Sequence, residues 1–251
     1  MRIVSWNIRA GGGKRADGIL HQLLEWAPAI IGLCEFRGTT ASQWIAAQLK
    51  QRGFEHQVSS VHPKYPARNA LLIASRYPLQ MLHHRGMPRI RERWILARID
   101  TPAPISLGMM HIPNYTEPKR KYLYMNAVLR LAKNWQEGPA IFMGDTNCGK
   151  SGIDEENPMA NVFKREHNWM EAMEQRDWVD AFRHVMGDRR EFTWYSHRNN
   201  GFRLDQAFCN PDIALSIDNV QHVWGQNIDF SNRRDALSDH AALILDLNEP
   251  G

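Results

Sequence analysis

Polar side chains that could act on a phosphate follow or interrupt several short apolar runs of the sequence. They are Asn7, Glu35, His111, Asp145, Asn147, Asp205, Asp239 and His240. Taken alone, an aspartate such as the one in "IFMGDTNCG" most often caps a turn. The set is harder to explain in that way, because a carboxylate beside a buried strand costs on the order of several kcal/mol unless it is paired. We therefore expect these groups to share one site, held together by a divalent cation and a hydrogen-bond network.

The ligand types in this set indicate which metal the site would hold. Carboxylate and amide oxygens suit Mg²⁺, with Mn²⁺ as a substitute, and the sequence has no C-x-x-C pair for a structural zinc. Mg²⁺ bound by one or two carboxylates keeps positions for water and a substrate phosphate, which fits metal-assisted phosphoryl transfer. The sequence has neither a G-x-x-x-x-G-K-[ST] loop nor a G-x-S-x-G elbow, so an NTPase and a serine hydrolase are disfavoured.

An α/β framework must position these side chains. Apolar runs predict strands at 2–6, 29–34, 70–75, 94–99, 105–111, 140–144, 203–209 and 241–247, and amphipathic segments predict helices at 17–26, 39–51 and 117–135. Residues 149–168 are the best candidate for a long surface loop, directly after the Asp145 segment. Because no repeat or low-complexity linker interrupts the pattern, we expect residues 1–251 to form a single domain.

The composition is that of an ordinary soluble globular protein, with 43% apolar and 23% charged residues in 251. No run approaches the roughly 18 apolar residues of a membrane span, and the first residues lack a signal-peptide pattern. Three cysteines give no disulfide framework. We expect a cytoplasmic monomer with no membrane association and no obligate protein partner.

Two clusters concentrate the positive charge, in a chain where Lys and Arg outnumber Asp and Glu by 31 to 27. The first, "RGMPRIRERWILAR", contains Arg91 and Arg93, and the second is "KRK" at 119–121. A phosphate-contacting stripe would explain the first cluster. Its alternation of arginines with other residues is equally typical of an exposed strand face, and both interpretations stay open.

The ordered blocks "SWNIRAGG", "GLCEFRG", "RNALLIASRYPL", "MMHIPN", "FMGDTN" and "LSDHAAL" resemble the endonuclease/exonuclease/phosphatase superfamily, from residue 5 to residue 243. The block from Trp178 to Phe208, with "DAFRH", "FTWY" and "GFRLD", is most similar to the exonuclease III and apurinic/apyrimidinic endonuclease branch. The resemblance implies a four-layer α/β/β/α sandwich, in which two mixed β-sheets pack together between outer helices. The site would lie at one edge, where strand ends meet.

The resemblance also implies a role for each catalytic side chain. Asp145 would orient or deprotonate the attacking water, and Asn147 would hold the scissile phosphate. His240, oriented by Asp205, would donate to a non-bridging phosphate oxygen. His111 can also donate to a phosphate. Positioned donors of this kind stabilise the charge that develops during in-line attack.

The remaining assignments from the resemblance concern the metal and the substrate. Glu35 would ligate Mg²⁺, helped by Asn7 and more loosely by Asp239. Substrate contacts would come from residues of the "HIPN", "FTWY" and "GFRLD" blocks and from the first basic cluster, namely Asn114, Trp194, Phe202, Leu204, Arg91 and Arg93. The aromatic and leucine side chains could wall a pocket for a flipped abasic sugar, or they could simply be core residues.

These observations favour a Mg²⁺-dependent phosphodiesterase that acts on DNA, with a duplex as the expected substrate, by nicking abasic sites or trimming 3′ ends in DNA repair. A second hypothesis keeps the metal chemistry but moves it to a lipid, nucleotide or small-molecule phosphoester. His111 motivates it, because abasic-site enzymes typically place a tyrosine there, whereas phosphatases and lipid phosphodiesterases often use a histidine. The third hypothesis is a nucleic-acid-binding module without catalysis.

Overall fold

Two six-stranded sheets form the centre of the protein. The structure is a computed structural model that describes residues 1–158, 163–226 and 236–248. The first sheet contains β1 (Arg2–Asn7), β2 (Ile30–Phe36), β3 (His56–Ser59), β4 (Ala70–Ser75), β13 (Ile217–Val223) and β14 (Ala242–Leu247), in the order β13-β14-β1-β2-β4-β3. The second contains β5 (Leu79–Met81), β6 (Trp94–Ile99), β7 (Ile105–His111), β8 (Ala140–Asp145), β9 (Val179–Asp180) and β12 (Asp205–Cys209), in the order β5-β6-β7-β8-β12-β9.

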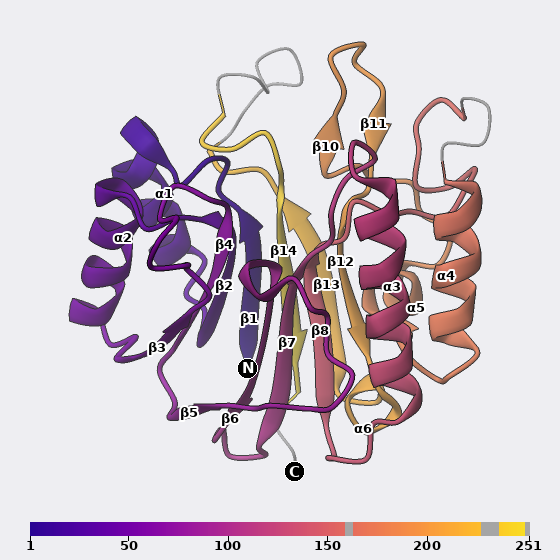
Figure 1. Cartoon of the computed structure of the whole chain (residues 1–251), viewed down its shortest axis with the longest axis horizontal. Helices are drawn as coiled ribbons and strands as arrows, with labels where there is room; N and C mark the ends of the chain where they lie inside the picture. Colours follow the sequence, from indigo (N-terminus) through magenta and orange to yellow (C-terminus); the bar gives the residue numbers. More distant parts are fainter. Residues whose placement is uncertain (159–162, 227–235, 249–251) are drawn as a thin grey trace.

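Helices cover the outer faces of the sheets, namely α1 (Ala16–Glu25), α2 (Thr40–Gln51), α3 (Pro118–Lys133) and α4 (Lys164–Glu174). The short helices α5 (Ala181–Met186) and α6 (Pro211–Ala214) add side chains to the core between the sheets. There are also 3₁₀ turns, η1 (Gly13–Arg15) and η2 (Arg91–Arg93). Figure 1 shows α1 and α2 on one side of the paired sheets and α3 and α4 on the other. A separate hairpin of β10 (Trp194–Tyr195) and β11 (Gly201–Phe202) projects beyond one end of the sheets. The predicted α/β/β/α sandwich with mixed sheets is therefore confirmed.

The central strands are buried on both faces, which explains why they appear in the sequence as continuous apolar runs. Side chains alternate along each strand between the core shared by the sheets and a core beneath the helices. In β1, Ile3 belongs to the shared core and Val4 to the core beneath α1 and α2. In β6, Ile95 belongs to the shared core and Leu96 to the core beneath α3 and α4.

The predicted elements are all present, with ends within two residues of those expected. The prediction of a loop over 149–168 is wrong at its C-terminal end, where α4 begins at Lys164, and residues 159–162 lie outside the described part of the chain. The strand-face interpretation of the first basic cluster is also wrong, because residues 91–93 form a 3₁₀ turn. In the described ranges no helix has the length and apolar character needed to span a bilayer.

Candidate active site

The register of the two sheets brings the polar strand ends together at one edge. β1 and β2 are parallel, and Asn7 lies opposite Cys34. Asn7 and Glu35, the residue after Cys34, therefore lie at the same end of the first sheet. β7 and β8 are also parallel, and their last residues, His111 and Asp145, are paired. β12 runs antiparallel to β8, so its first residue, Asp205, lies opposite Asp145. The carboxyl ends of four strands and the start of a fifth therefore converge.

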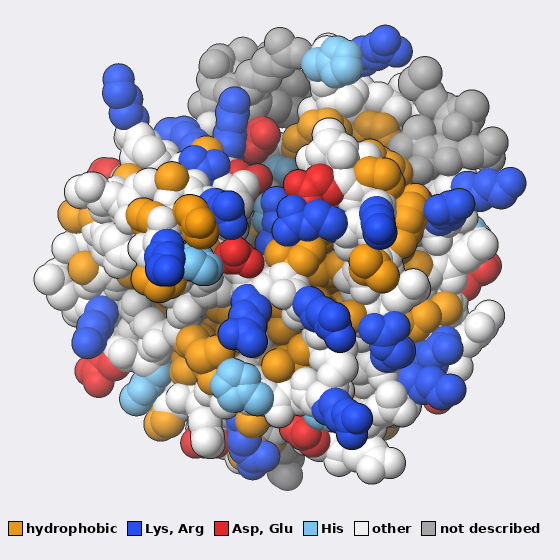
Figure 2. Space-filling model, viewed as in Figure 1, with side chains coloured by type: hydrophobic (Ala, Val, Ile, Leu, Met, Phe, Trp, Pro, Cys, Tyr) orange, Lys and Arg blue, Asp and Glu red, His pale blue; other side chains and the backbone are white. Residues whose placement is uncertain are grey.

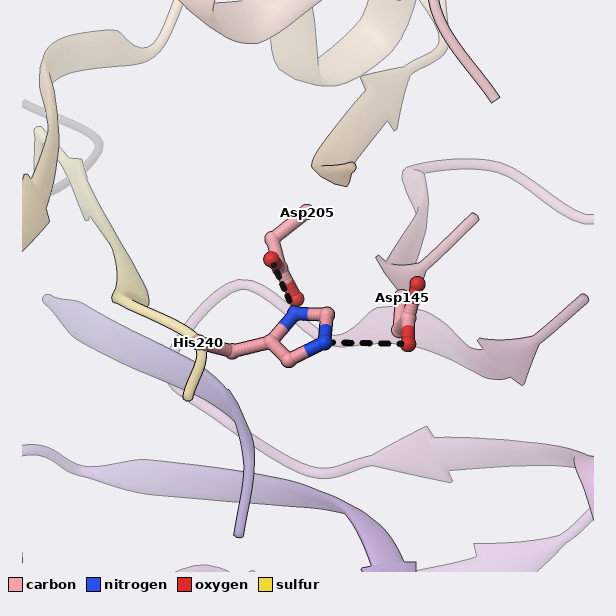
Figure 3. A group of neighbouring side chains, drawn as sticks. All are labelled: Asp145, Asp205 and His240. Carbon is pink, nitrogen blue, oxygen red and sulfur yellow. Dashed lines mark hydrogen bonds and ion pairs between the residues drawn. The ribbon is translucent and has the colours of Figure 1, made fainter. Parts of the chain in front are cut away.

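His240 lies between two buried carboxylates at this edge (Figure 3). Its Nδ1 is 2.9 Å from Oδ2 of Asp205, and its Nε2 is 3.9 Å from Oδ2 of Asp145. All three side chains are at most 8% exposed. We call Asp145, Asp205 and His240 the catalytic cluster, after the role that the sequence predicts for them. Its candidate ligand atoms lie within 4.8 Å of one another, but the Asp205–His240 hydrogen bond already occupies Nδ1, so the geometry is that of an oriented imidazole.

The electrostatics of this cluster suit acid–base chemistry. Burial raises the pKa of Asp145 to about 7, against the lowering effect of the His240 charge. Burial alone would lower the pKa of His240, but the Asp205 and Asp145 carboxylates outweigh it and raise that pKa to about 10. At neutral pH the imidazole is therefore a charged donor, and the facing carboxylate has a pKa suited to a general base.

Backbone and side-chain donors fix Asp145 from both sides. The amide nitrogen of Asn7 donates to Oδ2 at 2.9 Å, and the backbone N–H of Asn147 donates to Oδ1 at 3.0 Å. Asn147 itself has a left-handed backbone, with φ of 48°, and its side-chain amide donates to the Ile112 carbonyl at 2.9 Å. This tight turn presents both side chains of the Asp-x-Asn motif toward the same edge.

His111 borders the catalytic cluster as a neutral imidazole. Its Nε2 is 3.5 Å from Oδ2 of Asp145, and only 5% of its side chain is exposed. Burial lowers the pKa of His111 well below its usual value, and the charges of Arg93 and His240 lower it further. Nδ1 of His111 is buried and has no hydrogen-bond partner among the described residues. The structure thus places the predicted residue His111 directly beside the Asp145 carboxylate.

The predicted metal ligands gather beside Asn7, at the start of the loop that follows β1. Glu35 is the extra residue of a bulge between β2 and β4, with φ of 58°, and bulges of this kind re-aim a side chain next to a site. Its Oε2 accepts the Ala10 N–H at 2.6 Å, while Oδ1 of Asn7 accepts the Arg9 N–H at 3.0 Å. Asp239 joins this corner through a 3.9 Å contact with the Arg9 guanidinium. The donors are hard oxygens, so the corner fits a hard divalent cation.

The predicted substrate contacts are brought to the site only in part. The backbones of Trp194 and His240 form an isolated antiparallel β-bridge, and their ring centroids are 6.4 Å apart. The ring centroid of Phe202 is 6.0 Å from that of Trp194. Both aromatic side chains are half-buried beside the catalytic cluster, whereas Leu204 is a buried residue with 7% exposure. Asn114 is exposed, and its Oδ1 accepts hydrogen bonds from Thr116.

The two arginines predicted to contact substrate face different cavities. Arg93 lines a cavity of about 410 Å³ whose basic residues also include Arg37, Arg68 and Arg120. Arg91 lines a different cavity of about 810 Å³, together with His62 and His84 and other residues of that surface. The charge of Arg93, in the first cavity, acts on His111 at the catalytic edge.

Three residues that support the site were not predicted from the sequence. Trp6 Nε1 donates to the His240 carbonyl at 2.9 Å, and Ser238 Oγ donates to the Asn7 carbonyl at 2.5 Å. Lys121 reaches the Asn147 carbonyl. Trp6 and Ser238 belong to the "SWN" and "LSDH" blocks, so their proximity in sequence to Asn7 and His240 was a signal that could have identified them.

An oriented imidazole facing a buried carboxylate at the edge of a two-sheet sandwich, beside a corner of hard oxygen donors, defines a class of phosphoester hydrolases. Residues 4–240 match the Endonuclease/Exonuclease/phosphatase family, and the chain belongs to it. The predicted superfamily is confirmed, and the protein is a hydrolase of phosphoester bonds. Among curated proteins no sequence matches this chain.

Solved structures of similar fold cover almost the whole chain. A 3′-5′ exonuclease (NExo) from Neisseria meningitidis superposes with a TM-score of 0.78 at 19% identity, covering 99% of this chain and 100% of its own. A structure of the 3′ phosphatase NExo from Neisseria bound to product DNA hairpin superposes with a TM-score of 0.80 at 20% identity, and covers 99% of this chain and 100% of its own. An AP endonuclease from Archaeoglobus fulgidus also gives 0.80 at 20%, covering 99% and 100%. At these identities the likeness establishes the fold.

Proposed function

We propose that the protein is a Mg²⁺-dependent phosphodiesterase that hydrolyses DNA, with exonuclease III-like activity on abasic sites or on 3′ ends in DNA repair. The observation that carries the proposal is the oriented Asp205–His240 pair facing Asp145 at the strand-end edge. Cleaving a phosphodiester needs a positioned water, a base to accept its proton and donors for the phosphate oxygens. Each of these groups has a candidate at this edge.

The residues divide the work according to their charge and contacts. Asp145 accepts the proton of the attacking water, because its pKa near 7 makes it an effective base at neutral pH. His240 donates from Nε2 to a non-bridging phosphate oxygen, while Asp205 holds the ring through Nδ1. Asn147 uses one amide hydrogen on the Ile112 carbonyl, and its second amide hydrogen is the donor that we assign to the scissile phosphate.

Glu35 and Asn7 would hold the cation, with Asp239 as a more distant partner. When bound, Mg²⁺ or Mn²⁺ would polarise the phosphate and offset the charge that develops on it. The loop after β1 prepares this corner in advance, since the backbone N–H groups of Arg9 and Ala10 already orient the side-chain oxygens of Asn7 and Glu35.

Positive charge beside the edge supports DNA as the substrate. Arg93 lines the 410 Å³ cavity with three further arginines and only two acidic residues, Glu92 and Glu117. Figure 2 shows Lys and Arg side chains spread across this face of the molecule, below a hollow where acidic and histidine side chains are visible. A polyanion bound along such a face can place phosphates on both sides of the scissile bond against these cations, and those contacts increase its binding affinity. The similar structures, an exonuclease, a 3′ phosphatase bound to a product DNA hairpin and an AP endonuclease, support this assignment.

Cleavage of defined duplexes tests the proposal. With Mg²⁺, we expect wild-type protein to nick a duplex with an abasic analogue or to shorten a duplex with a recessed 3′ end, and Mg²⁺ chelation to abolish both reactions. Asp145→Asn is the matched control, because it preserves shape while removing the base. An absence of cleavage on both duplexes, with DNA binding equal in the two proteins, would contradict the proposal.

His111 favours a second candidate, a phosphatase or phosphodiesterase for a nucleotide, lipid or other small phosphoester. Its neutral imidazole, 3.5 Å from Asp145, can donate to a terminal phosphate. A panel of nucleoside monophosphates, inositol phosphates and a 3′-phosphorylated oligonucleotide separates the candidates. Turnover of a small phosphoester without cleavage of either duplex would select this second function.

A further inference from the structure

Lys121 is a fully buried cation next to the catalytic turn. It lies on α3, its side chain is 0% exposed, and its Nζ is 3.0 Å from Oε1 of Glu166 on α4, which is itself 1% exposed. The ring of Tyr115 covers the same ammonium, with its centroid 3.8 Å away. Burying an ammonium is costly, and these two neighbours compensate its charge.

The shortest of the polar contacts of Lys121 reaches the active site. Its Nζ donates to the backbone carbonyl of Asn147 at 2.6 Å. Glu166 balances the charge of Lys121, but its Oε1 has no hydrogen-bond partner among the described residues, so the hydrogen bond of Lys121 goes to the Asn147 carbonyl. This hydrogen bond ties both outer helices to the residue that we assign to the scissile phosphate.

The Asn147 carbonyl matters because its backbone conformation is uncommon. A left-handed φ of 48° costs free energy for a residue other than glycine, although asparagine tolerates it better than most. Other contacts hold the rest of the turn: the Asn147 N–H donates to the Asp145 carboxylate, its side chain donates to Ile112, and the next carbonyl, of Cys148, accepts from Gln206 at 3.0 Å. Among these contacts, that of Lys121 comes from a cationic donor, and charge-assisted hydrogen bonds are the stronger kind.

We infer that Lys121 is a positioning residue, whose ammonium fixes the Asn147 carbonyl and so keeps the side chains of Asp145 and Asn147 aimed at the scissile phosphate. Glu166 and Tyr115 hold the ammonium in place. The inference rests on the proposed function of this edge in phosphodiester hydrolysis. It assigns to the paired helices α3 and α4 a direct influence on the chemistry, through one side chain.

The first test compares Lys121→Met with Lys133→Met, the same substitution at an exposed position of the same helix. We expect Lys121→Met to lower kcat about 10- to 100-fold with KM changed less than about threefold, and Lys133→Met to match wild type. In an Asn147→Ala background, Lys121→Met should lower kcat by a smaller factor than in wild type, because one of the two side chains that it positions is gone. A wild-type kcat in Lys121→Met, or a full multiplication of the two losses, would overturn the inference.

A second measurement does not depend on activity toward any substrate. Hydrogen exchange of the Asn147 and Cys148 amides should be faster in Lys121→Met than in Lys133→Met, and unchanged exchange would contradict the inference. If Lys121→Met does not fold, Lys121→Arg and Glu166→Gln take its place. We expect the arginine variant to keep most of kcat and the glutamine variant to lose part of it. Failure of DNA cleavage by wild type would refute the proposed substrate, while the exchange result would still decide the role of Lys121.

Discussion

Two buried groups of charged side chains contain residues next to Leu204 in the sequence, Asp205 in one and Arg203 in the other, and they differ in charge balance. The catalytic cluster has two carboxylates, Asp145 and Asp205, around one imidazole, and Oδ1 of Asp205 has no hydrogen-bond partner in the described part of the chain. The other group, which we call the arginine cluster, consists of Arg183, Arg203, Asp154 and Asp180. There, two guanidiniums match two carboxylates.

The arginine cluster is densely hydrogen-bonded around Arg203, although Nε of Arg183 has no hydrogen-bond partner among the described residues. Arg203 is fully buried and forms bidentate contacts with Asp154, at 2.7 and 3.0 Å, and with Asp180, at 2.6 and 3.2 Å. Arg183 adds a further contact to Asp154. These pairs connect the 149–158 segment, β9 and the residues between β11 and β12. Because each buried charge in the arginine cluster has a partner, removing one of these charges should destabilise the fold. In the catalytic cluster the charges are not matched in this way, which is typical of groups that act on a substrate.

The largest effect that separates the two groups should come from Asp145→Asn. We expect kcat/KM to fall roughly 10⁴-fold, because the base is lost. The free energy of unfolding should change by less than about 1 kcal/mol, because burial already disfavours the charge on Asp145 and the amide keeps its shape. Steady-state kinetics and urea unfolding measure the two quantities. A large loss of stability would show that this carboxylate is structural.

The opposite outcome is expected for Arg203→Met. Removing one guanidinium leaves Asp154 and Asp180 buried with too few partners, which should lower the free energy of unfolding by about 3–5 kcal/mol. Arg2→Met is the matched control, since Arg2 pairs with Asp246 near the surface and such pairs contribute roughly 0–1 kcal/mol. Urea unfolding decides, and equal losses in the two variants would remove the distinction drawn for the arginine cluster.

Asp205→Asn probes the pairing inside the catalytic cluster. The Asp205 carboxylate helps to raise the pKa of His240. The amide should therefore lower that pKa and the fraction of His240 that is charged at neutral pH, and kcat should fall roughly 10²- to 10³-fold. Stability should stay near that of wild type, because an amide oxygen can still accept from Nδ1. Kinetics on the same DNA duplex provide the measurement. A kcat within twofold of wild type would argue against orientation of His240 by this residue.

The smallest expected effect is a pH dependence of stability in the arginine cluster. Burial alone would raise the pKa of Asp154, but Arg203 and Arg183 outweigh it and hold that pKa below its usual value. A lowered pKa contributes stability above the unfolded value of about 3.9, and that contribution is lost as pH falls through the folded value. The stability difference between wild type and Asp154→Asn should therefore shrink as pH falls from about 5 toward 2. Urea midpoints across this range measure it, and a constant difference would contradict the assignment.

The catalytic cluster could be predicted from the sequence because its members stand at the ends of apolar strands. Asp145 and His111 end neighbouring parallel strands, and such ends meet at one edge of a sheet. The arginine cluster offered no comparable signal. Arg203 lies 49 residues from Asp154 and 23 from Asp180, and nothing in the local pattern of either partner specifies such a pairing.

Lys121 shows how a local pattern can mislead. In the sequence it is part of "KRK", a basic cluster that would ordinarily lie in solvent. In the structure it falls on the buried face of α3, at helical spacing from Tyr124, Met125 and Val128. Its charge is typical of an exposed residue, whereas its spacing on the helix is typical of a buried one. Partners outside that helix, Glu166 on α4 and the Tyr115 ring, make the buried position tolerable.

The sequence by itself determined the α/β framework and the chemistry of its strand ends, because apolar runs and their periodicity depend on local residue order. It also determined the family, through motifs that span most of the chain. Tertiary structure decided which charges are matched and which are left for a substrate. It also placed Glu35 in a β-bulge and brought the ammonium of Lys121 to the carbonyl of Asn147. These features depend on contacts between distant segments, where the cost of burying a charge is set by the partner that the fold delivers.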